Sequence, residues 1–142
     1  MALLTVAPAG PLHGTLRMPG DKSISHRVLL LAALADGRST ITGLSDGEDV
    51  GHTRRAVEAL GATTEDDEDR VVVDGGDLHQ PDHDLDVGNA GTGIRLLTGL
   101  CAGLPFTTTL FGDESIAKRP MDRIAVPLRS MGAVIELSLI HI

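Results

Sequence analysis

The sequence has no tryptophan, no tyrosine and only two phenylalanines among its 142 residues. With a net charge of −8, it offers neither the basic surface nor the stacking rings of a nucleic-acid-binding protein. A single cysteine, Cys101, excludes an intramolecular disulfide framework and a cysteine-based zinc cluster, and fits a reducing compartment. No apolar run approaches the roughly 20 residues of a membrane span. Residues 1–11 lack the basic start of a secretory signal, so we expect a cytoplasmic protein.

The chain is long enough for about one domain, and its hydrophobic period switches repeatedly between that of a strand and that of a helix. The helix expected from residue 25 to 35 is apolar on nearly every side, which predicts that it is well buried. This alternation predicts an α+β (mixed α/β) fold. The other expected elements are strands at 15–18, 39–43, 106–111 and 133–137, a hairpin at 62–74 with an acidic turn at 65–69, and helices at 46–60, 90–103 and 120–131.

Two short stretches occur twice in the same order. Residues 27–29 (RVL) match residues 95–97 (RLL), and residues 59–62 (ALGA) match residues 130–133 (SMGA). Both offsets are about 70 residues, which favours a duplicated helix–strand–helix–strand unit. Chance similarity between two amphipathic helices is the alternative.

The start of each repeat combines a glycine turn, small polar residues and an arginine one turn into an apolar helix. In residues 19–27 (PGDKSISHR) the polar residues are Lys22, Ser23, Ser25 and Arg27. Free N–H groups and the positive end of the helix dipole favour an anion at such a start. The arginine adds a two-pronged donor for phosphate or carboxylate.

The second copy is residues 88–95 (GNAGTGIR), in which Asn89, Gly91, Thr92 and Arg95 take the corresponding places. A third candidate lies in residues 112–121 (GDESIAKRPM), where a lysine and Arg119 precede a proline at an expected helix start. Together the three motifs predict a site for a small polyanion.

Each motif also has a purely structural interpretation. The hydroxyl and amide side chains could only cap helices, and the arginines could be solvated surface residues. His26 could contact an anion, lie at the surface or cap a helix. His79 and His83 lie in a polar loop and are expected to face solvent, so no metal site is predicted.

The three motifs, in this order and spacing, resemble those of the 5-enolpyruvylshikimate-3-phosphate synthases, the enolpyruvyl transferases of the shikimate pathway. The resemblance runs from about residue 12 to residue 136. It implies transfer of the enolpyruvyl group of phosphoenolpyruvate to the 5-hydroxyl of shikimate 3-phosphate, with release of phosphate, for chorismate and aromatic amino acid biosynthesis. It also implies no metal or organic cofactor, duplicated βαβαββ-type units from an incomplete inside-out barrel, and a full enzyme that is a monomer.

The resemblance gives each motif residue a role. These are Lys22 between both substrates as the catalytic residue, Ser23 and Arg27 on shikimate 3-phosphate, Asn89 and Gly91 at the phosphoenolpyruvate site, Arg95 supporting that loop, and Arg119 clamping phosphoenolpyruvate. Glyphosate competes for the phosphoenolpyruvate site in this family. Because Gly91 stands where resistant relatives often have alanine, the resemblance implies a glyphosate-sensitive enzyme.

Length separates this chain from the family, whose full members are about three times longer. The resemblance implies that residues 1–20 form an entry strand of the other domain, that residues 21–136 form two repeats of one domain, and that residues 137–142 are a truncation scar. The fragment alone is therefore expected to be inactive. Two alternatives stay open: a UDP-N-acetylglucosamine enolpyruvyl transferase, and a non-catalytic anion-binding module.

Overall fold

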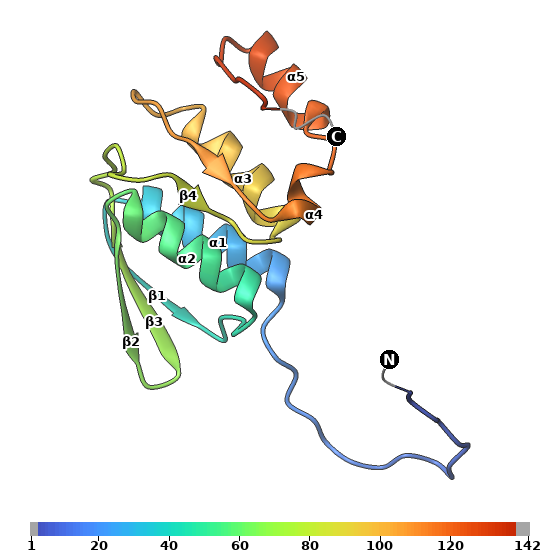
Figure 1. Cartoon of the computed structure of the whole chain (residues 1–142). Coiled ribbons are helices and arrows are strands. Elements are labelled where there is room, and N and C mark those ends of the chain that lie inside the picture. Colours follow the sequence, from blue (N-terminus) through green and yellow to red (C-terminus); the bar gives the residue numbers. More distant parts are fainter. Residues whose placement is uncertain (1–2, 139–142) are drawn as a thin grey trace.

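A computed structural model describes residues 3–138 and has the expected mixed α/β fold (Figure 1). Within those residues the strands form two small sheets and no closed barrel. The elements in chain order are α1 (Lys22–Leu34), β1 (Gly37–Thr42), α2 (Glu48–Ala59), β2 (Thr63–Asp67), β3 (Arg70–Gly75), β4 (Leu85–Asp86), α3 (Gly91–Cys101), β5 (Leu110–Phe111), α4 (Glu114–Ala117) and α5 (Asp122–Ser130).

The larger sheet has the strand order β1-β3-β2, with β3 antiparallel to both neighbours. In β3, Val71 and Val73 are buried while Val72 between them is only half-buried, as the alternation of a strand requires. The expected hairpin is confirmed, although its turn is shorter than the sequence indicated. Only two residues separate the strands, and the first, Glu68, has a left-handed φ of 55°.

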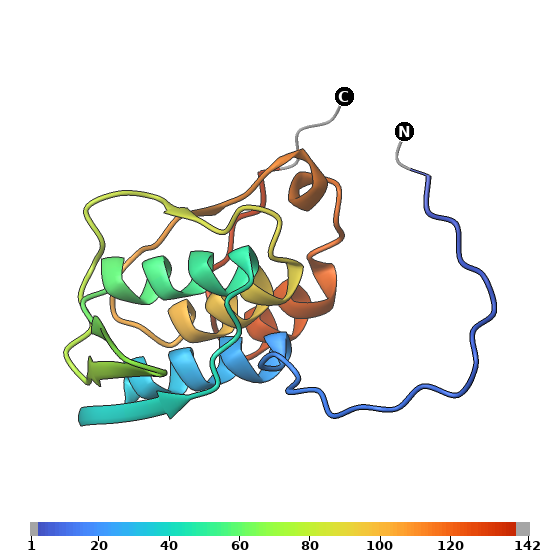
Figure 2. The same ribbon diagram turned by 90° about the horizontal axis from the view of Figure 1, so that it is seen from below.

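Helices α1, α2 and α3 pack against one another, and α1 also covers β3 of the larger sheet (Figures 1 and 2). Helix α2 contacts both sheets, through β2 and β4. The core between these layers is aliphatic, and its largest fully buried side chains are Leu29, Leu60, Leu85, Leu97, Val50, Val57, Val73 and Val87. This core holds the three helices relative to one another.

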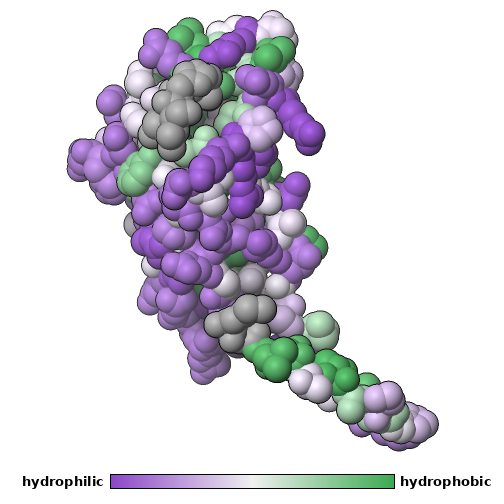
Figure 3. All heavy atoms as spheres, turned by 45° about the vertical axis from the view of Figure 1, so that its right-hand side comes forward, coloured by the Kyte–Doolittle hydropathy of each residue, from purple (hydrophilic) through white to green (hydrophobic). Residues whose placement is uncertain are grey.

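Two expected strands are absent from the structure. Residues 15–18 and 133–137 have no regular secondary structure, and Leu16 and Val134 are 85% and 93% exposed. A strand is stable only when its backbone groups pair with a neighbour, and neither segment has one within residues 3–138. Figures 1 and 3 show the N-terminal segment extending away from the body with apolar side chains in solvent.

Helix α1 is less buried than its sequence indicated. It begins at Lys22, three residues before the expected start, and it exposes Leu31 (65%) and Leu34 (49%) on the side away from α2 and α3. The prediction of a helix from the apolar pattern is therefore confirmed, but the prediction that this helix is well buried on nearly every side is wrong. Across residues 3–138, every helix is too short or too polar to cross a membrane.

The second half contains shorter strands than expected. The strand predicted at 106–111 is reduced to β5, which pairs in parallel with β4. Strand β4 and the single-turn helix α4 were not predicted from the sequence. The predicted domain boundaries at residues 20 and 136 stay predictions, and residues 139–142 of the expected scar lie outside the described residues.

Candidate functional site

The first motif is joined to α2 at the start of α1. Asp21 is the N-cap, and its carboxylate accepts a hydrogen bond of 2.7 Å from the Ile24 N–H. Lys22, the first helical residue, donates from Nζ to Asp49 Oδ2 at 2.7 Å. Because Asp49 lies in the first turn of α2, this ion pair holds two helix starts together.

The remaining residues of the first motif have different surroundings. Arg27 donates from Nη1 to the Ser23 carbonyl at 2.8 Å, so its guanidinium lies back along the exposed side of α1. Ser25 is buried, donates from Oγ to the Asp21 carbonyl and accepts from the Ser45 N–H. Ser25 is thus a structural residue that ties α1 to the loop before α2.

The second and third motifs meet at the start of α3. Arg95 donates from Nη1 to the Gly91 carbonyl at 2.7 Å and from Nη2 to the Pro120 carbonyl at 3.2 Å. The guanidinium of Arg119 occupies the space that a Cβ on Gly91 would need, and Arg95 Nη1 lies 3.3 Å from the same point. Two arginines therefore lie beside one glycine, and a side chain at that position would require the Arg119 guanidinium to move.

The loop that carries Asn89 is held from two sides. The Gly88 N–H donates to Asp86 Oδ1 at 2.8 Å, and its carbonyl accepts from the Asp113 N–H at 2.8 Å. Gly88 has a φ of 54°, and His52 of α2 fills the space beside it. A side chain at position 88 would be strained by the backbone conformation and blocked by the imidazole.

A pocket of about 220 Å³ lies between these elements. It is lined by Glu48, Asp49, His52, Gly88, Asn89 and Asp113. Its carboxylates repel an anion, and one of them, Asp49, is paired with Lys22. A hydrogen bond from the Ser115 hydroxyl, with smaller help from backbone N–H groups and Arg119, lowers the pKa of Asp113.

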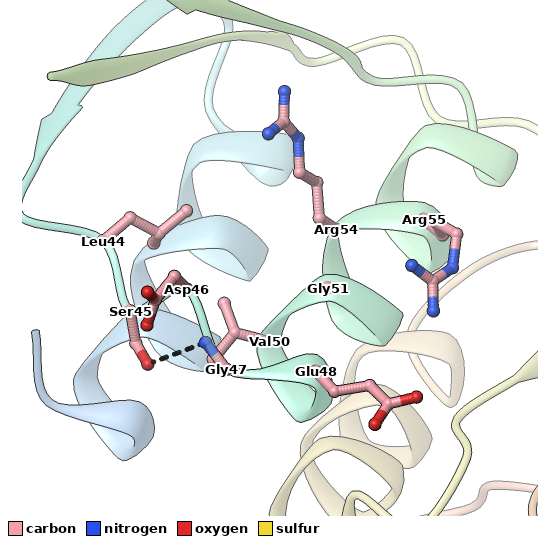
Figure 4. Close-up of a pocket in the computed structure, with 9 residues that line it drawn as sticks. All are labelled: Leu44, Ser45, Asp46, Gly47, Glu48, Val50, Gly51, Arg54 and Arg55. Atoms are coloured by element: carbon pink, nitrogen blue, oxygen red, sulfur yellow. Dashed lines mark hydrogen bonds between the residues drawn. The ribbon is translucent and has the colours of Figure 1, made fainter.

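A second pocket, of about 310 Å³, opens on another part of α2 (Figure 4). Arg54, one of its lining residues, points away toward the hairpin, where it binds Asp66. The Ser45 hydroxyl accepts a bond from the Gly47 N–H at 3.3 Å at the pocket's edge. The residues that line this pocket belong to none of the three motifs, and it shares only Glu48 with the pocket beside Asn89.

His26 occupies a position that the sequence interpretation did not foresee. It is fully buried, and its Nδ1 lies 2.7 Å from the hydroxyl of Thr53. Of the three alternatives that the sequence left open for His26, this position excludes the surface and the capping residue. Burial lowers the pKa of His26, which favours the neutral imidazole.

Other titratable residues lie outside the three motifs. Cys101 is partly buried, and burial raises the pKa of its thiol. His79 and His83 are exposed. Within residues 3–138, histidine, cysteine and acidic side chains form no cluster of three or more arranged to bind a metal ion.

Sequence reasoning missed three residues of α2 that contact the motifs. These residues, Asp49, His52 and Thr53, lie on one face because they are spaced by three and four positions. Residues 46–60 showed only an amphipathic helix, since the spacing cannot reveal which face meets the motifs. The polar residues on that otherwise buried face were the available signal.

Comparison with known proteins identifies the family. A sequence profile of the family EPSP synthase (3-phosphoshikimate 1-carboxyvinyltransferase) matches residues 6–140. That range is nearly the whole chain and includes all three motifs. The chain belongs to the EPSP synthase family.

Individual family members agree. The 3-phosphoshikimate 1-carboxyvinyltransferase of Anaeromyxobacter sp. (strain K) is 53% identical over 131 residues, which cover 92% of this chain and 30% of the relative. The protein of that name from Halorhodospira halophila is 53% identical over 137 residues, covering 94% and 31%. The solved EPSP synthase of Acinetobacter baumannii matches with a TM-score of 0.82 and 41% identity, over 88% of this chain and 29% of that one. The chain thus spans about a third of the length of its EPSP synthase relatives.

Proposed function

We propose that this chain supplies one side of the substrate cleft of a 3-phosphoshikimate 1-carboxyvinyltransferase. In this proposal the cleft transfers the enolpyruvyl group of phosphoenolpyruvate to shikimate 3-phosphate. The observation that carries the proposal is the meeting of Arg95 and Arg119 at Gly91, which joins two anion motifs at one helix start. The names of the relatives favour shikimate 3-phosphate over the aminosugar nucleotide as acceptor.

On the phosphoenolpyruvate side, we assign Asn89 and the backbone at Gly91 to binding, with Arg119 as the clamp. Arg95 acts behind them, because its two bonds to carbonyls fix the loop and the third motif in one arrangement. A guanidinium beside a helix N-terminus is suited to phosphate and carboxylate. Glyphosate, an anion of comparable size, would compete for the same groups.

On the shikimate 3-phosphate side, we assign Ser23 and Arg27 to phosphate binding and Lys22 to both substrates. Lys22 lies where α1 and α2 begin, and Asn89 lines the pocket beside its partner Asp49. Lys22 is therefore the motif residue best placed to stabilise charge that develops between the two reactants. Further groups, from parts of the full enzyme outside this chain, are needed to complete the cleft and counter its carboxylates.

A chimera tests the proposal. Residues 6–136 replace the matching segment of the Anaeromyxobacter enzyme, and phosphate release is measured with phosphoenolpyruvate and shikimate 3-phosphate. Turnover within about tenfold of the parent enzyme is expected, since preorganised groups determine the rate. UDP-N-acetylglucosamine as acceptor is expected to give none. A folded chimera without turnover would contradict the proposal.

Calorimetry on the chimera tests the assignment of sides. Arg27→Ala is expected to weaken shikimate 3-phosphate binding, and Arg119→Ala to weaken phosphoenolpyruvate binding, each by about tenfold or more because a charged hydrogen bond is lost. If both substitutions leave both affinities unchanged, the assignment of these arginines is wrong. Equal losses for both substrates with both variants would show that the two sides are not separate.

A further inference from the structure

The buried pair of His26 and Thr53 lies beneath the candidate site and belongs to none of the proposed substrate contacts. His26 is 0% exposed and Thr53 is 1% exposed. They come from different helices, α1 and α2, and their polar atoms are 2.7 Å apart. The imidazole Nε2 has no hydrogen-bond partner among the described residues, so without the bond to Thr53 both ring nitrogens would be buried and unsatisfied. The bond therefore favours one arrangement of the two helices.

Helix α3 contacts the same pair through Gly93. A Cβ at that position would lie 3.0 Å from Thr53 Oγ1 and 3.5 Å from His26 Cε1. The N-terminal halves of the three helices thus meet at one point with little spare space. His26 lies between the motif residues Lys22 and Arg27, and Gly93 lies two residues after Gly91. The pair therefore contacts both the first motif, to which His26 belongs, and the second motif, to which Gly93 belongs.

The same face of α2 contacts both motifs at two further points. One turn before Thr53, Asp49 pairs with Lys22 of the first motif. Its neighbour His52 contacts the Asp86 carbonyl at 3.1 Å and fills the space beside Gly88 of the second motif. Helix α2 carries no proposed substrate-binding residue, yet it connects the two helix starts that do.

We propose that His26 and Thr53 are positioning residues that set the separation between the start of α1 and the start of α3. The inference rests on the proposed function, in which each helix start holds one of the two reactants. Reaction rate then depends on the separation, and a displacement of about 1 Å can cost roughly a hundredfold in rate. Binding of each reactant alone depends on its own motif and is much less sensitive.

The first experiment needs no activity and uses the 142-residue chain. Backbone amide hydrogen exchange is measured at residues 91–94 in the parent, in Thr53→Val and in His26→Leu. Both variants remove the bond by replacing a polar side chain with an apolar one of similar size. Exchange at these amides is therefore expected to rise about tenfold. His26→Asn keeps a polar group where the imidazole has Nδ1, and it is expected to restore slow exchange.

Val57→Ala is the matched control, because Val57 is fully buried in α2, one turn after Thr53. It is expected to lower the overall stability while leaving residues 91–94 no faster than the rest of α3. If Thr53→Val and His26→Leu leave exchange at residues 91–94 unchanged, or if Val57→Ala raises it equally, the positioning role is overturned.

The second experiment measures kinetics in the chimera. Thr53→Val and His26→Leu are expected to lower kcat about tenfold or more, while each KM changes less than about threefold. His26→Asn is expected to recover most of kcat. A loss confined to KM, or an equal loss of kcat in Val57→Ala, would overturn the inference. An inactive parent chimera would count against the proposed function, whereas the exchange experiment would still decide the positioning role.

Discussion

The starts of α1 and α3 have similar sequences but differ in how their backbone N–H groups are used. At α1, the Asp21 carboxylate accepts from Ile24 and places a negative charge at the helix start. At α3, the N-cap is Ala90, whose side chain has no polar atom. The first-turn N–H groups of Thr92 and Gly93 have no intrahelical partner there.

Under the proposed function, this difference predicts that the two sides of the candidate site bind anions in different ways. An anion near α1 must be held by side chains, namely Lys22, Ser23 and Arg27, because a carboxylate already occupies the helix end. An anion near α3 can use backbone N–H groups beside Arg119. Duplication of a sequence pattern therefore does not imply duplication of the binding mode.

The largest effect that separates the two starts is expected from Gly91→Ala. The added methyl group would displace the Arg119 guanidinium, which occupies that space. Phosphoenolpyruvate affinity of the chimera is expected to fall about tenfold, or 1.4 kcal/mol, in calorimetry, while shikimate 3-phosphate affinity changes little. Glyphosate inhibition is expected to weaken in parallel.

Gly99→Ala is the control on the same helix, since a Cβ at Gly99 would meet nothing within 4 Å. It is expected to raise stability by about 0.5–1 kcal/mol through helix propensity, without a change in affinity. Unchanged phosphoenolpyruvate affinity in Gly91→Ala would show that Arg119 does not act at this helix start.

The next largest effect is expected at the capped start. Asp21→Ala removes the N-cap of α1, which is expected to lower the free energy of unfolding by about 0.5–2 kcal/mol in urea denaturation. Asp46→Ala is the control, because Asp46 is exposed and precedes the cap position of α2. Equal stability of the two variants would remove the distinction between a capped and an uncapped start.

A smaller effect is expected when α3 is given a cap. Ala90→Ser adds a hydroxyl that can accept from a first-turn N–H, and it is expected to stabilise the chain by up to about 1 kcal/mol. Since that N–H is then occupied, phosphoenolpyruvate affinity of the chimera is expected to fall about threefold. Higher stability with unchanged affinity would show that these N–H groups do not bind the anion.

Much of the fold could be predicted from local sequence pattern. The three packed helices and the hairpin all follow from apolar spacing and glycine stops, as in Gly61 after the second helix. The expected strands at 15–18 and 133–137 failed for a common reason. A strand depends on a partner that its own sequence does not name, and within the described residues those segments have none.

The candidate site shows the same limit. Lys22 and Gly91 could be singled out because glycine turns before apolar helices have a local signature. Asp49 and Thr53 could not, since their importance comes from contacts with helices about 27 and 40 residues away in sequence. The burial of His26 likewise depends on how α1 packs, which its neighbours in sequence do not determine.

The smallest expected effect concerns pH, and it also distinguishes the two helices. At the repeat offset that relates Arg27 to Arg95, His26 of α1 corresponds to Ile94 of α3, so only α1 buries a titratable ring there. Burial lowers the pKa of His26 below its ordinary 6.5 in the folded chain. Between the two pKa values the unfolded chain binds a proton that the folded chain does not, so stability falls as the pH drops below about 6.5.

The measurement is the free energy of unfolding between about pH 8 and pH 5, where carboxylates such as Asp113, whose pKa lies below the ordinary 3.8, stay ionised. The parent is expected to be level at the alkaline end and to lose stability toward pH 5, with a slope of at most about one proton. His26→Asn is expected to remove most of that slope, whereas His83→Asn, in the exposed loop, is expected to keep it. An identical slope in the parent and His26→Asn would show that folding does not lower the pKa of this imidazole.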